Sequence, residues 1–273
     1  MSKTTTVSKT RMLAEAAVML ALGIVLSLIK LLDLPYGGSI TVACMLPVII
    51  IAYRHGTAFG LLTGLVFGIS QQLLGLNTLS YVTTWQSIVA VILLDYIVAF
   101  AVLGFGGIFR KMPSQAMGLT TGTLFVCLLR FLCHVISGCT VWAGLSIPTN
   151  AALIYSIGYN ATYMVPETIV TAVIAYYIGS VIDFRNPAIT SIRSEEQNRI
   201  PVLKLLAGSV LAIMLVCDVV LIFMHLQNAE TGEFDASGLA SVNWILVAIV
   251  SVASAVIAAV LFVIGNKKSS KKA

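Results

Sequence analysis

The stretch MGLTTGTLFVCLLRFLCHVISGCTVW, residues 117–142, decides the fold class of this chain. Apart from Arg130 and His134, it holds no side chain that carries a positive charge. A helix needs about 20 predominantly apolar residues to cross about 30 Å of hydrocarbon. The stretch is long enough, so it predicts a transmembrane helix rather than a helix in the core of a soluble protein.

Further apolar runs continue this pattern on both sides, at residues 13–32, 40–53, 57–76, 86–109, 151–180, 202–226 and 240–265. Hydrophobic types make up 59% of the 273 residues and charged types 10%, and the mean hydropathy is +1.00. A soluble domain of this length needs more charge on its surface. Because backbone groups in lipid must pair within their own segment, we predict an all-α membrane protein of about eight spans. The run 40–53 is short and holds Pro47, so a tilted or broken helix is expected there.

The basic residues predict that both chain ends lie in the cytoplasm, since lysine and arginine concentrate in cytoplasmic loops. With the N-terminus inside, the basic residues at 3–11, 54, 110–111, 185–204 and 267–272 all fall on that side. The opposite loops near 77–84 and 143–150 carry no charge, and the loop near 227–238 carries only acidic residues. The net charge of +5 therefore reflects membrane topology, and no nucleic-acid partner is expected.

The polar stretch from Asp183 to Pro201 predicts a cytoplasmic linker. We expect a six-helix transmembrane domain at residues 1–182 before it. A C-terminal transmembrane hairpin with a basic tail is expected at residues 202–273.

Small residues recur at the spacing of helix contacts. Gly60, Gly64 and Gly68 form a double GxxxG pattern, and residues 118 and 122 form another. Such residues let helix backbones approach closely in lipid. For the glycines we favour packing within the protein. Ala17 and Ala21 form a similar pair on the first helix, where a one-sided small face is also suited to a docked partner.

Ionisable residues within spans are costly in lipid and usually face a cavity or a partner. The candidates are Glu15, Asp95, Arg130, His134, Glu167 and Asp218. At 1.5 Å per residue, Asp95, His134 and Asn160 each lie roughly 12–13 Å inward from the outer ends of three different spans. Tyr155 lies about 6 Å inward and Trp142 lies at the outer end of its span. We therefore expect one outward-facing pocket lined by these five residues.

Such a set suits a flat, positively charged heteroaromatic ligand. Aromatic faces attract cations, a carboxylate offsets the ligand's charge, and His134 and Asn160 supply hydrogen bonds. Two alternatives stay open. Trp142 and Tyr155 sit at a depth where aromatic residues collect without any ligand, and Asp95 could simply pair with Arg130 or His134.

Several catalytic motifs are absent from the sequence. It contains no GxxxxGK[ST] pattern for a P-loop, and no HExxH or GxSxG pattern for a membrane protease or lipase. We therefore expect a protein that is not an enzyme and that does not hydrolyse ATP through its own P-loop.

Residues 11 to about 182 resemble the thiamine-specific substrate-binding component, or S component, of energy-coupling factor (ECF) vitamin transporters. The resemblance rests on RMLAEAAVMLALGIVLSLI, GGSITVACMLPVIIIAYRHG, LLDYIVAFAVLGFGGIFR, RFLCHVISGCTVWAG and YSIGYNATYMVPE. Its most specific part is the spacing of His134, Trp142, Tyr155 and Asn160.

The resemblance implies a six-helix S-component bundle in the cell membrane that captures thiamine for uptake and needs no cofactor. In such proteins an acid, a histidine and an asparagine contact thiamine between aromatic faces. Asp95 would take the acid's role, His134, Tyr155 and Asn160 would hydrogen-bond, and Trp142 would stack. The resemblance further implies that Ala17 and Ala21 dock an ECF transmembrane coupling subunit. Two ATPase subunits would supply the energy in trans.

The chain departs from the family pattern at three places. Asp95 stands where some members carry glutamate. The first outer loop reads LPYGGS where some members carry a tryptophan, so Tyr36 is the candidate for stacking on that side. The C-terminal hairpin exceeds the six-helix pattern. A stand-alone secondary transporter, or an S component for another vitamin or organic cation, is the alternative function.

Overall fold

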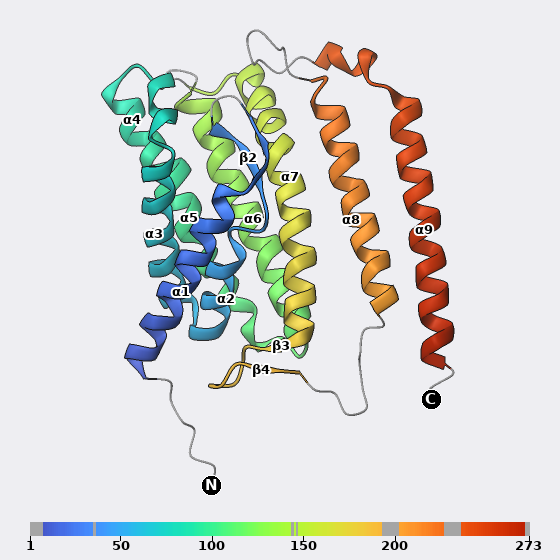
Figure 1. The fold of residues 1–273 in the computed structure, drawn as a ribbon. Helices are drawn as coiled ribbons and strands as arrows, with labels where there is room; N and C mark the ends of the chain where they lie inside the picture. The colour runs from blue at the N-terminus through green and yellow to red at the C-terminus, as the bar shows by residue number, and fades with distance from the viewer. Residues whose placement is uncertain are drawn as a thin grey trace. The chain divides into compact units, whose positions relative to one another are not determined.

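The computed structural model describes residues 8–34, 37–142, 145, 147–192, 202–226 and 236–270. The chain forms two compact units, Met1–Ser191 and Ile192–Ala273, and each is described by itself (Figure 1). Segments 193–201 of the predicted linker and 227–235 of the last outer loop lie outside the described residues.

The first unit is a helical bundle. Its long helices are α1 (Lys9–Leu28), α3 (Thr57–Leu74), α6 (Gln115–Thr140) and α7 (Asn150–Val181), and a composite fourth span runs through Trp85–Lys111. Helix α6 packs along α7, and α2 (Leu46–His55) packs against α1 and α3. Its apolar core gathers Met45, Ile49, Phe67 and Leu103, which are all fully buried.

The run 40–53, where a tilted or broken helix was expected, is helical only from Leu46. Strand β1 (Lys30–Asp33) pairs antiparallel with β2 (Ser39–Thr41), and a turn leads into α2 at Leu46. Pro47 lies in the first turn of α2, where its missing N–H breaks no helical hydrogen bond. Backbone groups of the two strands pair with each other across the hairpin, and Ile40 and Thr41 of β2 are buried in the protein. Lys30 begins β1 at the other end of α1 from Lys9, so one basic residue departs from the predicted charge pattern.

The fourth span changes its helical form along its length. It runs through α4 (Trp85–Val91), the π-helical turn η3 (Ile92–Val98), α5 (Ala99–Ala101) and the 3₁₀ segment η4 (Val102–Lys111). A short 3₁₀ turn, η2 (Leu76–Tyr81), precedes it. The π turn widens the helix and carries Asp95.

The glycine pattern of α3 packs inside the protein, as the sequence favoured. A Cβ built on Gly64 would lie 2.4 Å from the carbonyl oxygen of Phe100, and one on Gly68 would lie 2.5 Å from that of Tyr96. A Cβ on Gly122 would lie 2.9 Å from the carbonyl oxygen of Gly106. The glycines therefore let α3 and α6 touch the backbone of the fourth span.

After α7 the chain forms a short ladder within the predicted linker. Strand β3 (Ile182–Asp183) pairs antiparallel with β4 (Thr190–Ser191). Arg185, between these strands, donates from Nη2 to the hydroxyl of Tyr53 at 2.9 Å and to the carbonyl oxygen of Met112. The segment that follows α7 is therefore fixed to the ends of α2 and η4.

The second unit consists of α8 (Val202–Phe223), the 3₁₀ turn η5 (Ala236–Ser241) and α9 (Trp244–Ser270). Helices α8 and α9 pack against each other. Ser251 of α9 donates to the Oδ2 atom of Asp218 of α8 at 2.6 Å, which partners one oxygen of this intramembrane carboxylate.

Helices of membrane-spanning length and hydropathy occur at six places among the described residues, five in the first unit and one, Trp244–Gly265, in the second. Two shorter apolar helical stretches, Leu46–His55 and Leu206–Ile222, occupy the other predicted runs. The structure is thus an all-helical membrane protein at the positions that hydropathy indicated. The predicted count of eight full spans and their orientation stay predictions.

Candidate functional site

Asp95 is the centre of a polar cluster that joins the fourth span to α6. Its Oδ1 atom lies 2.7 Å from Nδ1 of His134, and its Oδ2 atom accepts from the hydroxyl of Ser137 at 2.6 Å and from the indole Nε1 of Trp142 at 3.2 Å. The side chain of Asp95 is 12% exposed and that of His134 is 10% exposed. Three donors, two from α6 and Trp142 from the turn that follows it, therefore hold both carboxylate oxygens in a defined orientation.

The local fold of the fourth span presents Asp95 to these donors. The residue lies in the middle of η3, a π-helical turn. Such turns are rare and frequently occur at functional sites. Because the backbone is wider there, residues after Asp95 are rotated relative to a regular α-helix, and the carboxylate meets α6.

His134 has one ring nitrogen committed to Asp95 and one that is not. A carboxylate only accepts hydrogen bonds, so Nδ1 of His134 donates to Asp95. Nε2 is buried and has no hydrogen-bond partner within the described part of the chain. A buried polar atom of this kind calls for an explanation, and a ligand donor is one.

Asn160 reaches the cluster through Tyr163 of the same helix. The hydroxyl of Tyr163 donates to Oδ1 of Asn160 at 2.6 Å, and Nδ2 of Asn160 donates to the carbonyl oxygen of Ser156 at 2.8 Å. The ring of Tyr163 meets the ring of His134 edge to face, with centroids 6.2 Å apart. Gly138 of α6 lets α7 pack closely at Ser156, since a Cβ on residue 138 would lie 2.2 Å from the hydroxyl oxygen of Ser156.

Tyr155 stands at the end of a row of aromatic rings on α7. It stacks on Tyr159 with centroids 6.1 Å apart and planes 10° apart, and Tyr159 in turn meets Tyr163 at 6.0 Å. The structure therefore links Asp95, His134, Trp142 and Asn160 through direct or one-residue contacts, and Tyr155 through the tyrosine row. Tyr36 lies outside the described residues.

The buried charges show one of the alternatives that the sequence left open, the pairing of Asp95 with His134. Asp95 bonds to His134, while Arg130 lies near Glu167, with Nη1 3.7 Å from Oε2. Thr41 donates to Oε1 of Glu167 at 2.6 Å, and Arg130 stacks over the ring of Phe100 at 4.3 Å. Glu167 and Arg130 thus form a separate buried set that ties β2 to α6 and α7.

Three contributors to the cluster were missed by sequence reasoning: Ser137, Tyr159 and Tyr163. Ser137 is fully buried three residues after His134, and Tyr163 follows Asn160 by three residues. Residues three or four apart share one face of a helix. That spacing from a predicted site residue was the available signal, and serine and tyrosine in a span are too common to stand out without it.

The two alanines proposed for docking lie on the outside of the first unit. Ala17 and Ala21 are exposed, and so are their neighbours Val18 and Leu22. The small face is therefore not used for packing within the described residues of this unit.

Comparison with known proteins gives a consistent family. The family model described as thiamine transporter protein matches residues 13–183. A curated relative, the thiamine transporter ThiT of Bacillus subtilis, is 36% identical over 174 residues, which span 59% of this chain and 86% of the relative. A solved structure of ThiT from Listeria monocytogenes shares the fold, with a TM-score of 0.51 and 23% identity over 63% of this chain and 94% of its own.

The matched region runs from within α1 to the end of β3 and includes every described residue of the cluster around Asp95. The matches are to transporters, which agrees with the prediction that the chain is not an enzyme. The chain is therefore a multi-pass membrane protein that belongs to the thiamine transporter protein family.

Proposed function

We propose that this chain captures thiamine in the cell membrane at the cluster around Asp95 and delivers it as the S component of an ATP-driven ECF transporter. The observation that carries the site is the arrangement of Asp95, His134 and Trp142, in which a carboxylate, a free ring nitrogen and an indole meet. The family match supports thiamine as the substrate.

Each group suits one part of thiamine. Asp95 offsets the positive charge of the thiazolium, since an opposite charge within about 4 Å contributes a few kcal/mol near a protein surface. The Nε2 atom of His134 accepts from the amino group of the pyrimidine. The face of Trp142 attracts the cationic ring, by about 2 kcal/mol where water is excluded.

Asn160 and Tyr155 complete the proposed site from α7. Nδ2 of Asn160 donates to both the carbonyl and the hydroxyl oxygen of Ser156, but Oδ1 keeps a second lone pair after accepting from Tyr163, so it can still accept from a pyrimidine amino group. Tyr155 offers a ring and a hydroxyl at the predicted outer end. Tyr36 is proposed as the stacking partner from the first outer loop.

The coupling partners of this proposal are a transmembrane coupling subunit and two ATPase subunits. The exposed Ala17 and Ala21 on α1 support a docking face, because small residues let a partner helix approach closely in lipid. The chain itself lacks a P-loop motif, so energy from ATP would come in trans.

Equilibrium binding to the purified full chain tests this function. Thiamine, riboflavin, biotin and choline are titrated separately, and saturable binding of thiamine alone is expected. Tight binding of another of these ligands in place of thiamine would contradict the substrate. Proteoliposomes then test the coupling: thiamine accumulation is expected only with the coupling and ATPase subunits and ATP. Accumulation driven by an ion gradient with this chain alone would instead establish a secondary transporter.

A further inference from the structure

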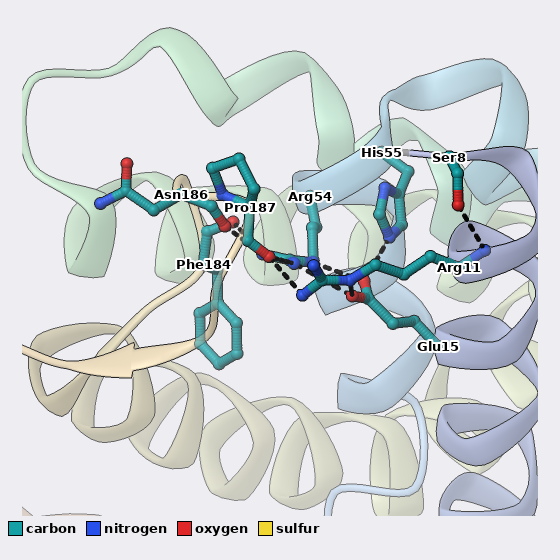
Figure 2. Close-up of polar contacts among 8 residues, drawn as sticks. All are labelled: Ser8, Arg11, Glu15, Arg54, His55, Phe184, Asn186 and Pro187. Carbon is teal, nitrogen blue, oxygen red and sulfur yellow. Dashed lines mark hydrogen bonds and ion pairs between the residues drawn. The ribbon is translucent and has the colours of Figure 1, made fainter. Parts of the chain in front are cut away.

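A second polar cluster surrounds Glu15 of α1, away from the proposed binding site. Figure 2 shows the carboxylate facing two residues from the end of α2. Arg54 donates from Nε to Oε2 at 2.6 Å and from Nη2 to Oε1 at 3.1 Å, and Nε2 of His55 lies 2.7 Å from Oε2. Arg11, one turn earlier on α1, donates to Oε1 at 2.9 Å. We call these four residues the Glu15 cluster.

The Glu15 cluster also holds the segment that follows α7. Arg54 donates to the carbonyl oxygens of Phe184 at 3.0 Å, Asn186 at 2.7 Å and Pro187 at 2.6 Å (Figure 2). The side chain of Arg54 is 4% exposed and that of His55 is 3% exposed. Removing the carboxylate would leave a buried guanidinium without its charge partner, which is a costly arrangement.

Elsewhere α1 packs on the bundle through the partly buried Met19, Leu20, Ile24 and Leu26, and Nε2 of Gln71 donates to the hydroxyl of Ser27 at 3.0 Å. Its buried residues are Ala16, Gly23 and Ser27. A Cβ on Gly23 would lie 3.1 Å from the carbonyl oxygen of Cys44 and 3.1 Å from the ring of Phe67. The backbone of α1 therefore packs closely there, but the glycine has no side chain that would interlock with its neighbours. No hydrophobic force drives helices together in lipid. Beside this apolar packing, the Glu15 cluster supplies several directional, charged contacts, which restrict the rotation of α1 about its axis.

That rotation determines where Ala17 and Ala21 point. At 3.6 residues per turn, they lie about 160° and about 120° around the helix from Glu15. Both are exposed, whereas Ala16 beside Glu15 is buried. A helix anchored at Glu15 thus presents its small face outward, and loss of the anchor lets that face turn.

We propose that Glu15 is a positioning residue for partner docking: bound by Arg54 and His55, it fixes the rotation of α1 and so aims Ala17 and Ala21 at the coupling subunit. This role rests on the proposed function, since it presumes the docking face. Glu15 takes no part in holding thiamine.

The test compares Glu15→Gln with Lys9→Gln, a neutralising change on the same helix whose side chain is exposed. Glu15→Gln is expected to lower ATP-driven thiamine uptake in proteoliposomes at least tenfold and to weaken co-purification with the coupling subunit. Thiamine affinity of the purified chain should stay within about threefold of the parent. Lys9→Gln should change neither property.

A second measurement follows the helix itself without any partner. Nitroxide labels replace the exposed Val18 of α1 and Leu128 of α6 in a background whose five native cysteines are substituted, and double electron–electron resonance gives their distance distribution. Glu15→Gln should shift or broaden this distribution, and Glu15→Asp, which keeps the charge, should do so less. If Glu15→Gln does not fold, Glu15→Asp carries both tests with smaller expected changes.

Two results would overturn the positioning role. One is an unchanged distance distribution in Glu15→Gln. The other is a loss of thiamine affinity that accounts for the whole loss of uptake. Failure of the unsubstituted chain to transport thiamine with its coupling subunits would instead contradict the proposed function, and the distance measurement would still report on Glu15 alone.

Discussion

The Nδ1 atom of His134 lies 2.7 Å from the Oδ1 atom of Asp95, so a side chain of α6 orients a carboxylate of the fourth span. His134 uses its Nδ1 atom on the carboxylate, and its Nε2 atom is buried with no partner among the described residues. One pair of residues thus presents a negative charge and an unpartnered ring nitrogen together. That combination matches a cationic ring system that also carries an amino group.

Replacing Asp95 by asparagine should weaken thiamine binding by about 10- to 100-fold. Hydrogen bonds to charged groups contribute about 1.5–3 kcal/mol, and each 1.4 kcal/mol is a factor of ten in affinity. Isothermal titration calorimetry measures the change. Asp218→Asn is the matched control, because its carboxylate is hydrogen-bonded to Ser251 in the second unit. Equal affinities for the Asp95→Asn variant and the parent would remove Asp95 from the site.

Trp142 should report binding by fluorescence. The sequence holds three tryptophans, Trp85, Trp142 and Trp244, and only Trp142 donates to Asp95. Thiamine should quench the emission of the parent chain, and Trp142→Phe should abolish most of that quenching while keeping an aromatic face. Trp244→Phe should retain it. Full quenching in Trp142→Phe would show that another tryptophan meets the ligand.

Tyr163→Phe should lower both stability and thiamine affinity. The change removes the donor to Oδ1 of Asn160, and a buried acceptor without a partner costs about 1–3 kcal/mol. Thermal unfolding in detergent and thiamine titration measure the two effects. Tyr177→Phe, at a position 45% exposed, serves as the control and should change little. Unchanged unfolding of Tyr163→Phe would contradict the hydrogen bond.

Glu167→Gln should destabilise the first unit more than the double change with Arg130→Met. Breaking a buried ion pair by removing one charge typically costs about 3–5 kcal/mol, whereas removing both charges costs much less. The side chains of Arg130 and Glu167 are 9% and 3% exposed. Each variant is heated and then run on size-exclusion chromatography. The fraction of protein that stays monodisperse ranks the variants by stability. A double variant less stable than Glu167→Gln would argue against charge pairing.

Gly64→Ala should lower the thermal stability of the protein, whereas Gly208→Ala should leave it unchanged. The new methyl group at residue 64 would meet the carbonyl oxygen of Phe100 at 2.4 Å, while nothing lies within 4 Å of one at residue 208. Overpacking of this kind costs about 1–3 kcal/mol. Thermal unfolding of both variants in detergent compares them. Equal stability of the two would mean that α3 and the fourth span separate easily.

Hydropathy located the helices well because the cost of placing polar groups in lipid acts on every residue of a span. The helices α3, α6, α7 and α9 fall within a few residues of the predicted runs. The run 40–53 was the exception. Composition cannot distinguish a helix from a hairpin such as β1–β2, in which Lys30 pairs with Thr41 and Asp33 with Ser39.

The residues proposed for the site also divide into those that the sequence predicted and those that it did not. Asp95, His134, Trp142 and Asn160 were predicted from depth along separate helices and from resemblance. Ser137, Tyr159 and Tyr163 escaped because their roles depend on which face of α6 or α7 turns inward. The π turn at Asp95 was equally hidden, since no residue type specifies it.

Residue types alone were enough to predict a helical membrane protein, the segments apolar enough to cross lipid, and the polar residues that are costly within them. These properties follow from transfer free energies that each residue carries wherever it lies. The folded arrangement was needed to show that Asp95 bonds to His134 rather than to Arg130, that Arg130 lies by Glu167, and that Arg54 holds Glu15. Those choices depend on helix rotation and on approaches of a few ångströms, which arise from packing between segments far apart in the chain.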